Sequence, residues 1–269
     1  MPSPGIPDAP GVDRGSACAL SVVIPAYNEA LNIANGVLTR VAAGLDELGL
    51  AYEVLVVDDG STDDTAARAQ TFAERQPRFR VLRHAHGGKA SATLHGMLAA
   101  AGDIVLMSDM DQATPIGEMA RLLPAFDQGA DVVVGSRGLA RPGAPIGRLL
   151  ISRTQVALRR LILGFGDIVD TQCGFKAFRR DVLRALIPSL VVYGADQQGL
   201  ESGPRLSPGF DVEILFLAKR RGYDVREVPV VWDYRSGRKA KLMRDSIRGV
   251  AELIAIRRAD RRGAYGARR

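Results

Sequence analysis

Two acidic residues follow a short apolar run, and they are the side chains in this sequence best suited to chemistry. The run is Ile104–Met107, and the acidic residues are Asp109 and Asp111. A buried strand here would present both carboxylates at its carboxyl end, where open α/β sheets bind their ligands. Two carboxylates at this spacing can hold one divalent cation, Mg²⁺ or Mn²⁺, particularly a cation shared with a diphosphate. A polar turn after a strand is the alternative, because Asp is common in turns.

Strand and helix patterns alternate around this pair through the first half of the chain. Apolar runs predict strands at residues 20–24, 52–57, 79–82, 104–107 and 131–134, and helical spacing predicts helices at 28–50, 62–74, 87–101 and 116–126. This alternation is typical of an α/β fold with a mostly parallel, doubly wound sheet. The polar residues that follow the strands are then expected to meet at one edge of the sheet.

The second half of the chain is less regular. A loop is predicted at 142–145, an apolar helix that carries several arginines at 146–165, and a long polar loop at 194–209. A helix at 210–221, a strand at 223–231 and an amphipathic helix at 241–257 complete the pattern. The sequence has no internal repeat, and its length suits one large domain or a domain with an appendage.

Basic residues concentrate at the C-terminal end. The 269 residues have a formal net charge of +6, and residues 235–269 contain twelve Lys and Arg against three Asp and Glu. The preceding part is therefore slightly acidic. Basic tails bind nucleic acid or anionic membrane, or they are solvated faces. Because this tail lacks interleaved aromatic residues for base stacking, we expect no nucleic-acid partner.

Cysteine usage and hydropathy favour a reduced, cytosol-facing protein. Cys18 and Cys173 are far apart in the sequence and outside any metal-ligand spacing. No apolar run reaches the roughly twenty residues that a transmembrane helix needs. Residues 1–12 lack the apolar core of a signal peptide, so we expect a loose tail there.

Three motifs occur in order at the ends of predicted strands. Residues 23–29 are V-I-P-A-Y-N-E, residues 56–61 are V-V-D-D-G-S, and residues 109–111 are D-M-D. The set resembles the inverting family 2 glycosyltransferases of the GT-A fold, a Rossmann-like, mostly parallel sheet with helices on both faces. The resemblance implies a nucleotide-sugar donor and a divalent cation.

Further motifs narrow the resemblance. They are G-K at 88–89, G-S-R at 135–137 and D-T-Q-C-G-F-K at 170–176. With them the sequence is most similar to dolichyl-phosphate β-glucosyltransferases, and more distantly to polyprenyl-phosphate mannose synthases. The resemblance extends from about Ser21 to Met243. The Q-x-x-R-W motif of processive members is absent, which disfavours a polysaccharide synthase. A nucleotidyltransferase is disfavoured as well, because no glycine-rich loop follows the first strand.

The resemblance implies a division of the chain. Residues 1–18 would be a flexible tail and 19–235 the glycosyltransferase domain, with a nucleotide-binding half at about 19–137 and an acceptor half at about 138–235. Residues 236–269 would be a basic amphipathic helix and tail.

The resemblance also assigns roles to individual residues. Donor and acceptor binding would fall to Pro25, Ala26, Tyr27, Glu29, Val57, Asp58, Gly88, Lys89, Asp109, Met110, Gln112, Arg137, Arg235 and Lys241. The cation would be held by Asp109, Asp111 and Gln112, and the catalytic residues would be Asp109, Asp111, Arg137, Asp170 and Asp211.

Several of these residues also have an ordinary structural interpretation. Glu29 suits a helix N-terminus, Asp58 an Asp-Gly turn, and Asp211 a helix N-cap. Asp170 fits a turn, and Gly88-Lys89 fits an N-cap followed by a solvated lysine. If Gly88-Lys89 does begin a helix, free backbone N–H groups and an ammonium there can face phosphate.

The expected reaction needs little acid–base chemistry. Negative charge grows on the diphosphate leaving group, and the cation, Lys89 and Arg137 would stabilise that charge. A lipid phosphate is already nucleophilic at neutral pH, so no general base is obligatory. Direct attack inverts the anomeric carbon and gives a β-linked product. We expect glucose from UDP-glucose, with GDP-mannose as the alternative donor.

Two helices suit a membrane surface. Met243, Ile247, Val250 and Ile254 share one stripe of the last helix, and arginines occupy its other positions. Residues 146–163 show the same mixture. Such helices bind at a bilayer interface, and the alternative is packing against the core. We therefore expect a peripheral protein on the cytoplasmic face of a membrane, with a membrane protein or a second copy of the chain as a partner.

Overall fold

The computed structural model describes residues 15, 17–138, 156–165, 168–193, 209–233 and 242–266, with the backbone alone for 242–248. The strands are β1 (Leu20–Ala26), β2 (Tyr52–Asp58), β3 (Phe79–Arg83), β4 (Ile104–Met107), β5 (Val132–Ser136), β6 (Lys176–Arg179) and β7 (Val225–Pro229). The helices are α1 (Ala30–Ala34), α2 (Val37–Asp46), α3 (Thr65–Ala73), α4 (Lys89–Ala99), α5 (Met119–Asp127), α7 (Arg180–Leu186), α8 (Phe210–Arg220) and α9 (Leu242–Arg261), with 3₁₀ turns η1 (Ile116–Glu118) and η2 (Ile187–Ser189). Residues 156–163 are also helical.

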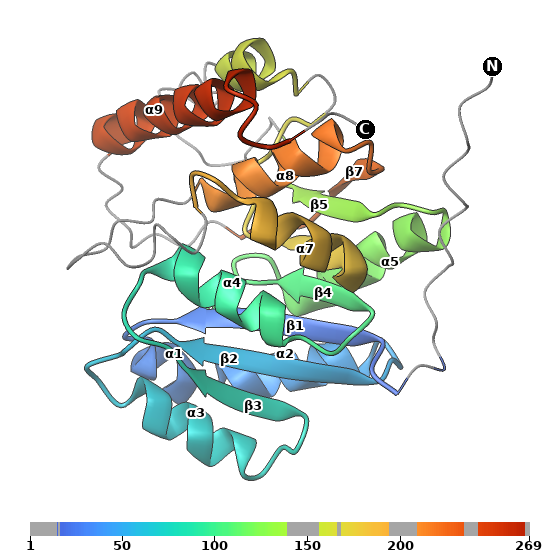
Figure 1. The fold of residues 1–269 in the computed structure, drawn as a ribbon. Helices are drawn as coiled ribbons and strands as arrows, with labels where there is room; N and C mark the ends of the chain where they lie inside the picture. Colours follow the sequence, from blue (N-terminus) through green and yellow to red (C-terminus); the bar gives the residue numbers. More distant parts are fainter. Residues whose placement is uncertain are drawn as a thin grey trace.

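One seven-stranded sheet forms the centre of the molecule (Figure 1). Its strand order is β3-β2-β1-β4-β6-β5-β7. The strands β1 to β4 pair in parallel, as do β5 and β7, whereas β6 runs antiparallel to both of its neighbours. The prediction of a mostly parallel sheet is confirmed.

Both faces of the sheet are buried, which explains the continuous apolar runs of its strands. Val23, Leu55 and Val57 face one core, which α4, α7, α8 and α9 cover. Val22 and Val56 face the other core, which α2, α3 and α5 cover. Successive strand residues point to opposite faces, so each strand contributes to both cores.

The predicted helix at 28–50 is wrong as a single element. Gly36 adopts a left-handed conformation (φ 74°) between α1 and α2 and breaks the helix there. Glycine adopts this conformation without steric cost, so the chain turns at that point. The strand β6 and the helix α7 were not predicted, because Lys176–Arg179 is short and has charged residues at both ends.

The last helix packs against the domain. Leu253 and Ile256 of α9 are buried, and Asp260 accepts a 2.6 Å hydrogen bond from Arg220 of α8. Ile254, on the predicted membrane stripe, is 38% exposed, whereas the side chains of Met243 and Ile247 lie outside the described residues. The helix is confirmed, and its interfacial role stays a prediction, as do the domain boundaries. Within the described residues, no helix is both long and apolar enough to cross a membrane.

Candidate functional site

The carboxyl ends of β1, β2 and β4 lie at one edge of the sheet. The register pairs Ala26 with Asp58 and Val23 with Met107, so the segments that follow these strands are neighbours. This brings together most of the residues predicted to bind the donor. The side chains of Ala26, Val57 and Met110 are buried in the two cores. A ligand would therefore contact these three residues through their backbone atoms.

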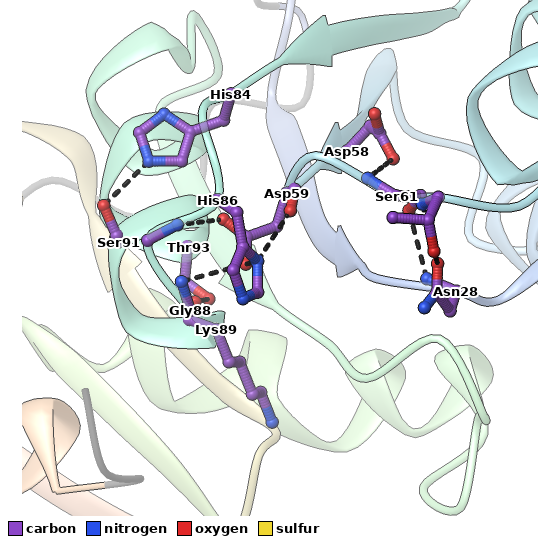
Figure 2. A network of polar contacts seen from close by, with 12 residues as sticks. Asn28, Asp58, Asp59, Ser61, His84, His86, Gly88, Lys89, Ser91 and Thr93 are labelled. Carbon is purple, nitrogen blue, oxygen red and sulfur yellow. Dashed lines mark hydrogen bonds and ion pairs between the residues drawn. The ribbon is translucent and has the colours of Figure 1, made fainter. Parts of the chain in front are cut away.

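The loops after β1 and β2 are tied together by side chains. Asn28 has a left-handed backbone (φ 56°), and its Oδ1 accepts a 2.9 Å hydrogen bond from the amide of Thr62. The amide of Asn28 donates to Ser61 Oγ at 3.0 Å, and the amide of Glu29 donates to Thr65 Oγ1 at 2.7 Å. Figure 2 shows Asn28 and Ser61 directed toward each other. Sequence reasoning did not assign Asn28, although it lies within the V-I-P-A-Y-N-E motif.

The two adjacent aspartates after β2 have different partners. Asp58, which is 3% exposed, accepts a 3.3 Å hydrogen bond from the amide of Ser61, as in the Asp-Gly turn that the sequence allowed. Asp59 is 2% exposed, and its two carboxylate oxygens accept hydrogen bonds of 2.9 Å from the amides of Gly87 and Gly88 (Figure 2). The N–H of Gly88 is therefore bonded to Asp59, contrary to the expectation that it is free to face phosphate.

Two histidines of the loop before α4 lie near this network, and only His86 contacts Asp59. His86 Nδ1 is 3.0 Å from Asp59 Oδ2, and its ring stacks on Tyr27 with the ring centroids 4.4 Å apart. His84 Nε2 is 2.7 Å from Ser91 Oγ, and its ring stacks on His95. Burial lowers the pKa of His84, and the nearby charge of His95 lowers it further. His84 and His86 therefore hold the loop before α4 in place through different partners, and their side chains do not form a common site.

The predicted metal pair lies beside Lys89. Lys89 Nζ forms an ion pair with Asp109 Oδ1, and a Cβ on Gly174 would overlap the Asp109 carboxylate. Gly174 is thus required where the D-T-Q-C-G-F-K segment passes Asp109. Asp111 Oδ1 accepts a 3.1 Å hydrogen bond from the amide of Ala113. The carboxylate of Asp111 is therefore part of a polar turn.

Gln112 follows this pair in an unusual conformation. Its φ is 50°, a conformation that non-glycine residues rarely adopt, and the residue is 7% exposed. Its Nε2 donates to Ser108 Oγ at 3.0 Å and to the carbonyl oxygen of Asp109 at 2.8 Å. These bonds fold the side chain against the strand end. The proposed role of Gln112 as a metal ligand stays a prediction.

The acidic pair suits a cation whose remaining ligands come from a substrate. Among the described residues there is no group of three or more His, Cys, Asp or Glu that could hold a metal ion. Mg²⁺ commonly binds one or two carboxylates together with substrate phosphates, and does not need a cage made wholly of protein. Asp109 and Asp111 fit that requirement. The ion pair between Lys89 and Asp109 would have to open or rearrange when the cation binds.

Arg137 is held rigidly by Asp170. Its Nε and one Nη each donate a 2.7 Å hydrogen bond to the carboxylate, and its backbone amide donates to the same group at 3.0 Å. Glu227 of β7 accepts hydrogen bonds from the amides of Val169 and Asp170 at 2.6 and 3.0 Å, which fixes this segment. Burial alone would lower the pKa of Arg137, but the hydrogen bonds and charge of Asp170 outweigh it and raise that pKa.

A polar cleft extends from Asp109, the first residue of the acidic pair, to Arg137. It is lined by Asp109, Ala113, Thr114, Arg137, Gln172, Cys173, Gly174, Phe175 and Trp232. The guanidinium of Arg137 lies over the Trp232 ring, 5.6 Å from its centroid. Burial raises the pKa of the Cys173 thiol, and the charge of Asp170 adds to that effect. Residues that precede and residues that follow the 139–155 region thus line one cleft together with Asp109.

Asp211 lies behind this cleft. It is 4% exposed, and its Oδ2 accepts a 2.5 Å hydrogen bond from Lys176 Nζ. Lys176 is fully buried and also donates to the carbonyl oxygen of Cys173. Asp211 therefore supports the cleft loop through Lys176, which suits a positioning role better than proton transfer. Arg235 and Lys241 lie outside the described residues, and their roles stay predictions.

Comparison with known proteins identifies the family of this chain. Residues 21–187 match the family model described as "Glycosyl transferase family 2". A dolichyl-phosphate beta-glucosyltransferase from Saccharomyces cerevisiae is 30% identical over 270 residues, which covers 91% of this chain and 76% of that protein. A polyprenol monophosphomannose synthase from Mycolicibacterium smegmatis is 33% identical over 244 residues, which covers 87% of this chain and 84% of that protein.

A solved structure has the same fold. Glucosyl-3-phosphoglycerate synthase from Mycobacterium tuberculosis, in complex with phosphoglyceric acid, superposes with a TM-score of 0.63 and 25% identity. The match covers 92% of this chain and 85% of that protein, so the predicted GT-A fold is confirmed. The family match contains the acidic pair, Lys89, Arg137 and Asp170. The chain belongs to glycosyltransferase family 2.

Proposed function

We propose that this enzyme transfers a hexose, glucose from UDP-glucose, to a polyprenyl phosphate with inversion at the anomeric carbon. The observation that carries the proposal is the convergence of Lys89, Asp109 and Arg137 at one sheet edge and its cleft. Two cationic side chains beside a carboxylate pair suit a diphosphate and its cation. The similarity to a dolichyl-phosphate beta-glucosyltransferase supports the acceptor and the sugar.

The residues at this sheet edge and its cleft have distinct roles in this proposal. Asp109 and Asp111 would hold Mg²⁺ or Mn²⁺, and the cation would supply Lewis-acid stabilisation of the diphosphate. Lys89 leaves its ion pair with Asp109 and binds the diphosphate, so that its charge offsets the charge developing on the leaving group. Arg137 is already oriented by Asp170 and needs little reorganisation to donate to phosphate.

No residue is required to remove a proton from the acceptor. A phosphate monoester has a second pKa near 6, so its oxygen is a nucleophile at neutral pH. Asp170 holds Arg137 in two hydrogen bonds and therefore acts as a positioning residue. Attack opposite the departing diphosphate gives a β-linked sugar from an α-linked donor. Arg235 and Lys241 are proposed to close over the diphosphate and the acceptor.

Two alternatives follow from the same comparisons. The similarity to a polyprenol monophosphomannose synthase makes GDP-mannose the second candidate donor. The structural match to a glucosyl-3-phosphoglycerate synthase makes a small phosphorylated acid the second candidate acceptor. We place the enzyme at the cytoplasmic face of a membrane, because a polyprenyl phosphate lies in the bilayer and a nucleotide sugar is in the cytosol.

The test is a transfer assay with separated donors and acceptors. The purified protein is incubated with Mg²⁺ or Mn²⁺ and with labelled UDP-glucose or GDP-mannose, in the presence of polyprenyl phosphate or 3-phosphoglycerate. We expect label in the lipid extract from UDP-glucose. Label from GDP-mannose alone would replace the donor, and label only in the aqueous product would replace the acceptor. Transfer in none of the arms would contradict the proposed function.

A further inference from the structure

Asp59 organises more of the site than its neighbour Asp58. Its carboxylate accepts from the amides of Gly87 and Gly88, and both its Oδ2 and its carbonyl oxygen lie 3.0 Å from His86 Nδ1. Gly60 allows this close approach, because a Cβ there would lie 3.1 Å from the amide nitrogen of His86. The loop between β3 and α4 is thus fixed to the end of β2 at three points.

The hydrogen bonds of Nδ1 determine which nitrogen of the His86 ring can bind a ligand. Both partners of Nδ1 are hydrogen-bond acceptors, so Nδ1 carries a hydrogen and donates it. In the neutral ring Nε2 then keeps its lone pair and can accept a hydrogen bond. Figure 2 shows this second nitrogen pointing away from Asp59. The side chain of His86 is 35% exposed, so its outer edge is accessible to a ligand.

The neighbours of His86 indicate which part of a ligand it meets. One ring face stacks on Tyr27, which is 43% exposed at the end of β1. Lys89 begins α4 three residues further on and reaches the acidic pair. A nucleotide whose diphosphate lies between Lys89 and Asp109 therefore has its nucleoside on the side of Tyr27 and His86.

We propose that His86 binds the nucleoside part of the donor. Its Nε2 accepts a hydrogen bond from a base N–H or a ribose hydroxyl, Asp59 holds the ring by Nδ1, and Tyr27 supports its face. This inference rests on the proposed use of a nucleotide sugar. It adds a specificity residue to the set of donor-binding residues that the family resemblance implies.

The test compares nucleotide binding with diphosphate binding. His86→Phe keeps a ring on Tyr27 and removes the nitrogen, and the Gly87 and Gly88 amides still bond to Asp59. Dissociation constants are measured by calorimetry for UDP, GDP and inorganic pyrophosphate, each with Mg²⁺. The matched control is His84→Asn, because His84 lies in the same loop but contacts Ser91 and His95.

We expect a loss of nucleotide binding without a loss of pyrophosphate binding. His86→Phe weakens binding of the preferred nucleotide by about 3- to 10-fold, the scale of one hydrogen bond, and leaves pyrophosphate binding unchanged. His84→Asn changes neither. Unchanged nucleotide binding by His86→Phe would overturn the inference, and so would an equal loss for pyrophosphate, because His86 would then act only through the Lys89 loop. If the wild-type protein bound neither UDP nor GDP, the proposed function itself would fail.

Discussion

At the scale of single residues, Arg137 and Asp170 behave as one unit. Asp170 is 3% exposed and makes three hydrogen bonds to Arg137, two from the guanidinium and one from the amide. Removing one partner of a buried ion pair leaves a buried charge less compensated, and this costs about 3–5 kcal/mol. The pair is therefore important for stability as well as for orienting the guanidinium in the cleft.

We predict different outcomes for two substitutions of Arg137. Arg137→Ala lowers the free energy of unfolding by about 3–5 kcal/mol, because the buried carboxylate of Asp170 loses the charge and the two hydrogen bonds of the guanidinium. Arg137→Lys keeps the charge but not the two-point geometry, so kcat/KM for transfer falls by about 10- to 100-fold with a smaller loss of stability. Urea unfolding and initial-rate kinetics measure the two effects.

The control is Arg68→Ala, which removes an exposed ion pair with Asp64 in the region of α3. Exposed pairs contribute about 0–1 kcal/mol, so this variant should unfold nearly as the wild type does and keep its activity. An Arg137→Lys enzyme with the wild-type rate would show that the bidentate geometry is not used.

The carboxylates at the strand ends could be predicted from the sequence, but their partners could not. The spacing of Asp109 and Asp111 predicted a carboxylate pair at a strand end, and the structure has one beside Lys89. Nothing local distinguishes Asp58 from Asp59, because which of them turns toward Gly87 and Gly88 depends on a loop 28 residues away. Glu227 and Gly174 were missed for the same reason, since their partners are distant in sequence.

At the scale of elements, the helix α4 determines where Lys89 lies. It packs on β1 and β2 at Gly96, where a Cβ would lie 2.5 Å from Val23 Cγ1 and 2.8 Å from Val57 Cγ2. The helix can approach the sheet this closely only without a side chain at that position. Lys89, at the first position of α4, is thereby held near Asp109.

We predict that Gly96→Ala destabilises the protein by about 1–3 kcal/mol through overpacking and also raises KM for the donor. The added methyl group moves α4 and with it Lys89. The matched variant is Gly249→Ala in α9, where a Cβ meets nothing within 4 Å. There alanine should stabilise the helix by up to about 1 kcal/mol. Thermal unfolding measures both changes in stability. If Gly96→Ala and Gly249→Ala changed stability equally, close packing of α4 on the sheet would not explain the glycine at position 96.

Helix breaks and short strands were the elements hardest to predict. The apolar spacing of residues 28–50 continues through Gly36, so the pattern gave no sign that α1 and α2 are separate. The β6 strand is only four residues long, and its antiparallel place between β4 and β5 depends on tertiary pairing. The longer buried strands were predictable because both of their faces are apolar.

At the scale of the whole molecule, α9 connects the basic C-terminal region to the domain. Tyr265, just after α9, donates a 2.6 Å hydrogen bond to Glu213 of α8. Glu213 is fully buried and also accepts from the amides of Val191, Val192 and Tyr193. The helix is thus attached on one side, while Ile254, Arg258 and Arg261 remain exposed on it.

We predict that this exposed side of α9 binds anionic membrane. Replacing Ile254, Arg258 and Arg261 by Gln should weaken cosedimentation with anionic liposomes, because an apolar anchor and two charges are lost. The matched control replaces Leu31, Arg68 and Arg75 by Gln, which removes the same types of exposed side chain from the region of α1 and α3. If both triple variants bound liposomes as the wild type does, the interfacial role of α9 would be excluded.

The central claim is that the acidic pair after β4 is the site of sugar transfer. The most direct measurement is kcat/KM for labelled-sugar transfer by the wild type, Asp109→Asn and Asp111→Asn, with and without a chelator. The control Asp64→Asn alters an aspartate whose side chain is 76% exposed. We predict a loss of at least about 100-fold for both variants of the pair and for chelated wild type, and none for the control. Transfer that survives both substitutions, or that continues in the presence of chelator, would contradict the account.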